Sequence, residues 1–93
     1  MTANSEVSGV ILDGLTPGSL VDVETRSRHY QIECLGGTAI RISGHPEYCP
    51  QPTEAQLHSR IGLGEHLVFY LRGGRPVTTS RVLNVHVTKP SIH

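Results

Sequence analysis

Hydrophobic and polar residues alternate with a period of two along much of the chain, which is the pattern of half-buried β-strands. The segment 20–26 shows this pattern, because Val21 and Val23 alternate with Asp22 and Glu24. The same alternation predicts four further strands, at 30–34, 38–43, 67–71 and 77–87. Helical patterning is negligible by comparison, so the chain is predicted to be all-β.

The turns between the first three predicted strands decide which residues face each other, and opposed residues share a face of the sheet. A two-residue turn after the second strand would place Ile32 opposite Arg41, whereas a three-residue turn at 35–37 places Ile32 opposite Ile40. The same test across the preceding turn places Val23 opposite Ile32. We therefore predict a three-stranded meander with one continuous buried face and a glycine of positive φ at a bulge in its second turn.

A second hairpin is predicted around the Arg-Gly-Gly-Arg sequence at 72–75, and the strand that leaves it is unusually long. Its alternation along 77–87 is interrupted at Arg81, which we interpret as the point where the strand bends to stay on the core. The alternative is an Arg81 guanidinium that points into the mouth of a barrel. The outward face of this strand lacks Lys and Pro, so we expect an exposed edge unless residues 7–12 cover it as a sixth strand.

The connection 44–64 between the two hairpins is too long for an ordinary turn and is predicted to be an insertion with structure or function of its own. Its first half contains three prolines and is expected to be an extended, stiff arm. Thr53 and Gln56 fit a capping box, which predicts a short helical turn that ends near Ser59. Residues 1–9 are polar and are expected to form a flexible tail.

Together these elements predict a small five- to six-stranded antiparallel barrel with one long loop that carries a short helical turn. An SH3-like barrel is the expected architecture, and an OB-like barrel is its main alternative. Because 93 residues leave room for one hydrophobic core, the whole chain, 1–93, is expected to be a single domain.

Composition narrows the functional classes. Eight Lys and Arg balance eight Asp and Glu, so the chain lacks the net charge that would recruit nucleic acid or an anionic membrane. No stretch approaches the roughly 18 apolar residues of a membrane span, and residues 1–6 do not resemble a secretion signal. We therefore expect a cytoplasmic protein without membrane contact, in which Cys34 and Cys49 remain free thiols.

Metal binding is one candidate chemistry, because the chain has six histidines and two cysteines, and both side chains are common zinc ligands. The nearest cluster of such residues is formed by His45, Cys49 and His58 in the long connection. The spacing is poor, since the chain has neither a Cys-x-x-Cys nor a His-x-x-x-His pair. Zinc binding by these three residues is therefore kept as an alternative function.

Catalysis is disfavoured by the motifs. The chain has no Gly-x-Ser-x-Gly nucleophile motif, and its Gly-Leu-Gly sequence at 62–64 precedes a predicted strand instead of opening a helix around a phosphate. A barrel of this size also has little room for a pocket that excludes water from a nucleophile and its base. We predict a protein that is not an enzyme and needs no cofactor.

Binding is the remaining class. Weak single-stranded nucleic-acid binding is an alternative but is disfavoured, because three Tyr, one Phe and no Trp provide few rings for bases to stack on. Recognition of a protein, or self-association as a homodimer, requires only a strand edge or a loop surface. We predict that the connection 44–64 and the exposed edge form this surface. The predicted contact residues are Tyr48, Arg72, Arg75 and Arg81.

Overall fold

The computed structural model describes residues 9–10, 16–58 and 60–88, and within them the chain forms strands and no helix. The strands are β1 (Gly9–Val10), β2 (Leu20–Thr25), β3 (His29–Gly36), β4 (Ala39–Ser43), β5 (Thr53–Gln56), β6 (Ile61–Gly62), β7 (His66–Leu71) and β8 (Arg75–Thr88). The all-β prediction is confirmed. In the described part of the chain, no helix is long and apolar enough to cross a membrane. The predicted tail, 1–9, lies almost entirely outside the described residues.

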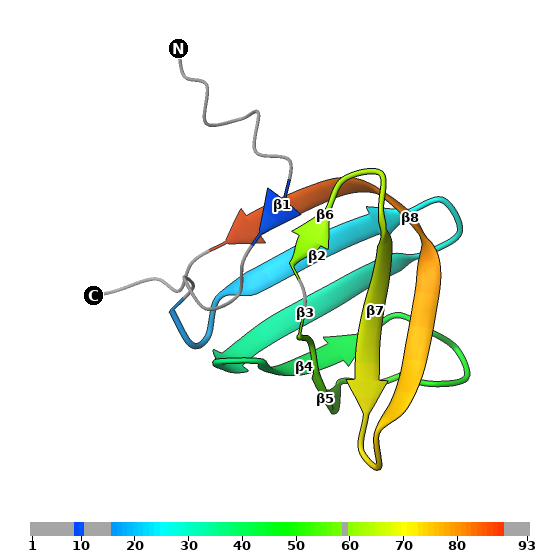
Figure 1. Ribbon diagram of the computed structural model, residues 1–93. Helices are drawn as coiled ribbons and strands as arrows, with labels where there is room; N and C mark the ends of the chain where they lie inside the picture. Colours follow the sequence, from blue (N-terminus) through cyan, green and yellow to red (C-terminus); the bar gives the residue numbers. More distant parts are fainter. Residues whose placement is uncertain (1–8, 11–15, 59, 89–93) are drawn as a thin grey trace.

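Six of the strands close into an antiparallel barrel in the order β2-β3-β4-β5-β7-β8, and β1 pairs with β6 in a separate two-stranded sheet (Figure 1). The predicted small antiparallel barrel is thus confirmed. Every barrel neighbour is also the next barrel strand along the chain, which is an up-and-down order. The closed barrel is consistent with the predicted class of small SH3-like or OB-like barrels.

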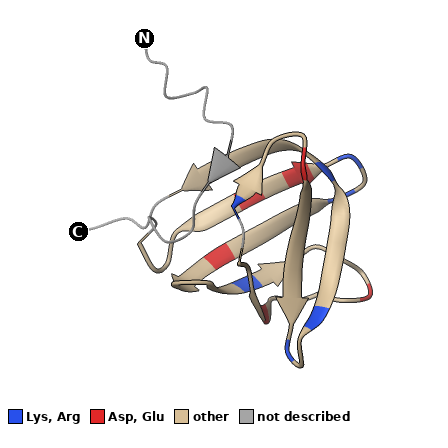
Figure 2. Cartoon of the chain, viewed as in Figure 1, with Lys and Arg blue, Asp and Glu red and all other residues tan. Residues whose placement is uncertain are grey.

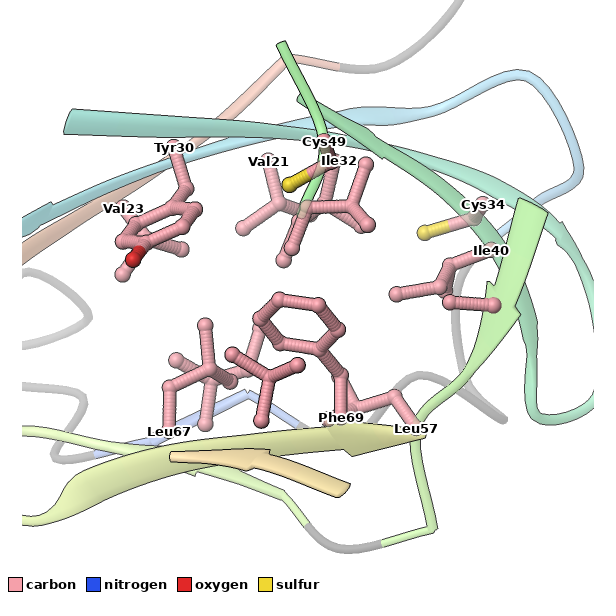
Figure 3. Packing of buried hydrophobic residues seen from close by; sticks show 14 of the residues in the cluster. Val21, Val23, Tyr30, Ile32, Cys34, Ile40, Cys49, Leu57, Leu67 and Phe69 are labelled. Atoms are coloured by element: carbon pink, nitrogen blue, oxygen red, sulfur yellow. The ribbon is translucent and has the colours of Figure 1, made fainter. Parts of the chain in front are cut away.

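The interior of the barrel is a single cluster of apolar side chains from all six strands and from the connection 44–64. Tyr30 on β3 and Phe69 on β7 meet edge to face across it, with ring centroids 6.1 Å apart, and both rings are almost completely buried (Figure 3). The alternation of the sequence therefore separates core from surface on the first three strands of the barrel as predicted, with Val21, Val23 and Ile32 fully buried.

The register of the first meander differs from the prediction by two residues. Val23 lies opposite Tyr30 instead of Ile32, because Thr25 closes a tighter turn: its backbone N–H donates to the carbonyl oxygen of Arg28 at 2.8 Å. In the next turn Ile32 lies opposite Ile42. The buried face is preserved nevertheless, since a shift of two residues returns each side chain to the same side of the sheet.

Glycine shapes the second turn as expected. The pairing of β3 with β4 is irregular between Cys34 and Gly36, and Gly36 and Gly37 have φ angles of 125° and 56°. Both φ values lie in the region that side chains with a Cβ rarely adopt. The predicted bulge with a glycine of positive φ is therefore confirmed, whereas the three-residue turn at 35–37 is wrong, because Gly36 still pairs with Ala39 and only 37–38 form the turn.

Strand β8 bends near Arg81, as predicted, and closes the barrel by pairing with two different strands. Its first half pairs with β7 and its second half with β2, with one irregularity in each ladder. Each irregularity adds one residue to β8 and switches the face that points inward. As a result Val82 is buried and Leu83 is 55% exposed, the opposite of what uninterrupted alternation predicts.

The predicted exposed edge on β8 is wrong, because both halves of the strand have a partner within the closed barrel. The expected cover, 7–12, is described only at Gly9–Val10, and these residues pair with β6 rather than with β8.

The connection 44–64 also differs from the prediction. Residues Thr53–Gln56 form β5, not a helical turn, and all four of them pair with β4. The local preference of the capping box is overridden because β5 buries Ala55 against the core and satisfies the backbone of β4. The proline-rich half is not an extended arm: its backbone closes a tight turn, in which the Cys49 N–H donates to the carbonyl oxygen of His45 at 3.0 Å.

Candidate functional site

A pocket of about 390 Å³ lies where β5 meets the β7–β8 hairpin. Strands β5 and β7 share only the pairs Ala55–Leu71 and Gln56–Tyr70, so their pairing ends where β7 enters the β7–β8 turn. Mouths of β-barrels are common binding positions, since strands diverge there and leave space that side chains do not fill. We call this surface the open end; it comprises β5, His58, the residues from Tyr70 to Arg75, and Tyr48.

The pocket combines an apolar wall with a polar rim. The apolar residues are buried or half-buried and come from the β3–β4 hairpin, β5 and β7: Leu35, Ala39, Ile40, Ala55 and Leu71. The polar residues are more exposed: Glu54, Gln56, His58, Tyr70 and Arg72. An apolar cavity with a few convergent polar groups is the usual composition of a ligand site.

Direct contacts hold the rim in place. His58 packs edge to face on Tyr70, with ring centroids 5.5 Å apart. The Thr38 hydroxyl donates to Oε1 of Gln56 at 2.6 Å, which ties β5 to the β3–β4 hairpin. The rim is therefore partly preorganised, and preorganisation lowers the entropy lost on binding.

Among the described residues around the pocket, some charged side chains have an ion-pair partner and others do not. Arg41 forms an ion pair with Glu33 at 3.0 Å and reaches Glu54 at 3.7 Å, so it links three neighbouring strands. Arg72 lines the pocket and also a second opening of about 300 Å³ that it shares with Thr53 and Glu54. Among the described residues, neither Arg72 nor Arg75 has a carboxylate oxygen within 4.0 Å. Figure 2 shows basic residues at the β7–β8 hairpin and at the β2–β3 turn, and others elsewhere, including on β4.

Tyr48 forms a second cluster at the same hairpin. Its ring packs on His45, with centroids 4.6 Å apart, and the Arg75 guanidinium carbon lies 5.5 Å from the centre of the ring. His45 Nδ1 accepts hydrogen bonds from the backbone N–H groups of Glu47 and Tyr48 at 3.1 and 3.3 Å. Two predicted contact residues, Tyr48 and Arg75, are thus brought together, with 37% of Tyr48 exposed.

The three predicted metal ligands do not form one cluster, although His45 and Cys49 pair through their backbones. Cys49 is completely buried and points into the same interior as Ile32 (Figure 3), whereas His58 packs on Tyr70 at the pocket. Burial raises the pKa of the Cys49 thiol, although a backbone hydrogen bond at His45 opposes the shift, so the sulfur stays protonated near neutral pH. Within the described ranges, no three His, Cys, Asp or Glu side chains are grouped so that they could hold a metal ion.

Arg81, the last predicted contact residue, lies outside the open end. Its guanidinium donates to the carbonyl oxygen of Gly64 at 2.8 Å, and its own carbonyl oxygen accepts a hydrogen bond from the Arg26 N–H at 3.1 Å. These contacts fasten the β6–β7 turn and the β2–β3 turn to the bend of β8. They account for Arg81 as a structural residue at that bend.

The sequence prediction identified the arginines and Tyr48 but not the pocket itself. The pocket depends on β5 lying beside β7, and the expectation of a helical turn at 53–59 concealed that pairing. The alternation of Ala55 and Leu57 with polar neighbours is the signal that could have indicated a strand there. Comparisons with protein-family models, curated proteins and solved structures found no match to this chain.

Proposed function

We propose that this protein is a small binding module that recognises a partner protein at the open end of its barrel. The observation that carries the proposal is the pocket beside Arg72, which has an apolar wall, a partly preorganised polar rim and a cation without a carboxylate partner in the described part of the chain. Tyr and Arg are the residue types that most often carry binding energy at protein interfaces. Tyr48, Tyr70, Arg72 and Arg75 supply both types on this one surface.

The open end replaces the strand edge as the binding surface, since β8 is paired within the barrel. The connection 44–64 is still proposed to contact the partner, but through other parts than an extended arm and a helical turn. It contributes Tyr48 to the Arg75 cluster and β5 with His58 to the pocket. Two buried cysteines that form no disulfide support a reducing compartment, the cytoplasm, as the place where the partner is met.

Site-specific photo-crosslinking tests this proposal. A benzophenone amino acid is introduced at His58, which is exposed at the open end, or at Glu47, which is exposed next to Tyr48, and in separate controls at Glu24 on β2 or Leu83 on β8. The protein is then irradiated in an extract of the cells that produce it. We expect a discrete crosslinked product from Glu47 and His58 that is absent from both controls.

The mass of the crosslinked product identifies the partner, and a product of twice the chain mass would identify self-association through this surface. Products formed at Glu24 or Leu83 but not at the open end would contradict the proposal. Circular dichroism of each labelled protein confirms that the barrel is intact before the products are compared.

A further inference from the structure

We infer that the open end binds an acidic peptide segment, in which an apolar side chain enters the pocket and a neighbouring carboxylate pairs with Arg72. The inference rests on the proposed function and specifies its ligand. A single extended segment meets both requirements, because Arg72 lines the pocket and also the second opening beside Thr53 and Glu54.

Charge complementarity favours an acidic ligand. Arg41 is occupied by Glu33 and Glu54, so its charge is already balanced. Arg72 and Arg75 flank the Gly73–Gly74 turn, and no described carboxylate lies within ion-pairing distance of either. The planar guanidinium presents paired donors that match a carboxylate, which makes arginine well suited to this contact.

The shape and composition of the pocket favour an apolar neighbour to that carboxylate. Ile40 and Ala55 are nearly completely buried and form part of the wall, and the Tyr70 and His58 rings form part of the rim. An aliphatic or aromatic side chain placed there is removed from water, which stabilises the complex by roughly 25 cal/mol for each Å² of apolar surface buried. The carboxylate would then supply orientation and specificity.

A peptide fits this surface better than single-stranded nucleic acid does. Glu54 borders both openings, and Glu47 lies in the Tyr48 turn, so a run of phosphates would meet two carboxylates beside the two arginines. Most proteins that bind nucleic acid also attract it with a positive net charge, whereas the net charge here is zero. A single carboxylate directed at Arg72 meets less of this repulsion than a run of phosphates does, because Arg41 offsets part of the Glu54 charge.

The test is a selection of random peptides displayed on phage against the immobilised protein, followed by fluorescence anisotropy with the selected peptides. We expect selected sequences to carry Asp or Glu within about three residues of Leu, Ile or Phe. Arg72→Glu should weaken binding about tenfold or more, the loss expected for a charge-assisted contact of about 1.4 kcal/mol. Glu54→Gln should strengthen binding about two- to threefold, because it removes a nearby negative charge.

Arg26→Glu is the matched control. Arg26 lies in the β2–β3 turn, is exposed, and has no ion-pair partner among the described carboxylates, so the same charge reversal there should change affinity less than twofold. Selected peptides without acidic residues that lose affinity with Tyr70→Ala but not with Arg72→Glu would overturn the acidic ligand while leaving the proposed surface intact. Peptides that are insensitive to both variants would count against the surface as well.

Two further outcomes also decide the inference. A failure to enrich any peptide above a control domain would overturn it, and the crosslinking experiment would then judge the proposed function independently. Binding of a single-stranded oligonucleotide that weakens steeply with salt and is abolished by Arg72→Glu would replace the peptide by nucleic acid as the ligand.

Discussion

Residues 44–49 and 53–58 belong to one connection between hairpins, yet the first segment is anchored in the core by one buried side chain, whereas the second borders the pocket. Cys49 is completely buried among the core side chains, whereas Glu54, Gln56 and His58 are exposed around the pocket. The difference follows from pairing. The first segment closes on itself through backbone hydrogen bonds, while residues 53–56 of the second pair with β4 and only two of them pair with β7.

This contrast between the sealed core and the open end shows where binding can evolve in so small a barrel. The proline-rich segment was expected to be a free surface arm but contributes to stability through the buried Cys49, while its Tyr48 stays exposed at the open end. The open end is available because its strand ladder stops before the hairpin does. Incomplete pairing is thus a better guide to the site than irregular sequence.

The largest predicted effect separates two neighbouring side chains of β7 that face the two regions. Phe69 is completely buried in the core, whereas Tyr70 is half-buried at the pocket. Phe69→Ala should lower the free energy of unfolding by about 3–5 kcal/mol, because it removes a ring and leaves a cavity. Tyr70→Ala should cost about 1 kcal/mol while weakening peptide binding. Urea unfolding followed by circular dichroism measures the free energy of unfolding of both variants. Equal losses would contradict the distinction between a core residue and a pocket residue.

The next effect compares two glycines of positive φ, one in each region. Gly44 has φ of 129°, and a Cβ on it would collide with the carbonyl oxygen of His29; Gly74 has φ of 84° and open space around the same position. Gly74→Ala should cost roughly 1–2 kcal/mol through backbone strain alone. Gly44→Ala should cost at least about 1 kcal/mol more, because the backbone must also move. Similar unfolding midpoints in urea for the two variants would show that the segment 44–49 is not tightly packed.

Alkaline pH should weaken the sealed core. Burial raises the pKa of the Cys34 and Cys49 thiols above their ordinary value of 9.0 and that of the Tyr30 hydroxyl above 10.0. The unfolded chain releases these protons at lower pH than the folded chain, so their contribution is complete below about pH 9 and is lost as the pH rises through the folded values.

The measurement is the urea midpoint at pH 7.5 and at pH 10 under reducing conditions, and it should fall at the higher pH. The Cys34→Ala, Cys49→Ala double variant should show a smaller fall, since two of the three groups are gone. A midpoint that rises between these two pH values would contradict the burial of the thiols.

The smallest predicted effect concerns the ion pairs of Arg41 beside the open end. Arg41, Glu33 and Glu54 are all more than a third exposed, so solvent and salt screen their attraction. Arg41→Gln should lower stability by about 0.2–1 kcal/mol, and the difference from the unmodified protein should shrink in 1 M NaCl. By freeing Glu54, the variant should also weaken binding of acidic peptides. A large loss of stability that persists in high salt would show that Arg41 acts through packing instead.

The sequence predicted the faces of the first three barrel strands and their order in the meander but not their register. A period of two determines which side of the sheet a residue occupies, and it is blind to a shift by two residues. The actual register depends on the Thr25 turn and on the bulge before Gly36, which are local hydrogen-bonding details. Likewise, two irregularities in β8 exchange Val82 and Leu83 between inside and outside; Arg81 marks the first of them, but no residue type marks the second.

The candidate site was also predictable only in part. Composition and loop position were enough to select Arg72, Arg75 and Tyr48, because arginine and tyrosine in turns are frequent contact residues. The pocket was not predictable, since it requires β5 to lie next to β7 and the Thr53 capping box indicated a helix. Local preference was overridden there by the unpaired backbone of β4, a tertiary effect that a window of sequence does not contain.

The most direct test of the account is a titration of the ¹⁵N-labelled protein with 3-phenylpropionate, a probe that joins an apolar ring to a carboxylate. The account predicts saturable shifts at the amides of 53–58 and 70–75, little change at 20–32, and weaker shifts with the neutral analogue 3-phenylpropanol. Shifts that concentrate around Leu63 and Leu83, the other exposed large apolar side chains of the described chain, would contradict it and move the binding surface away from the open end.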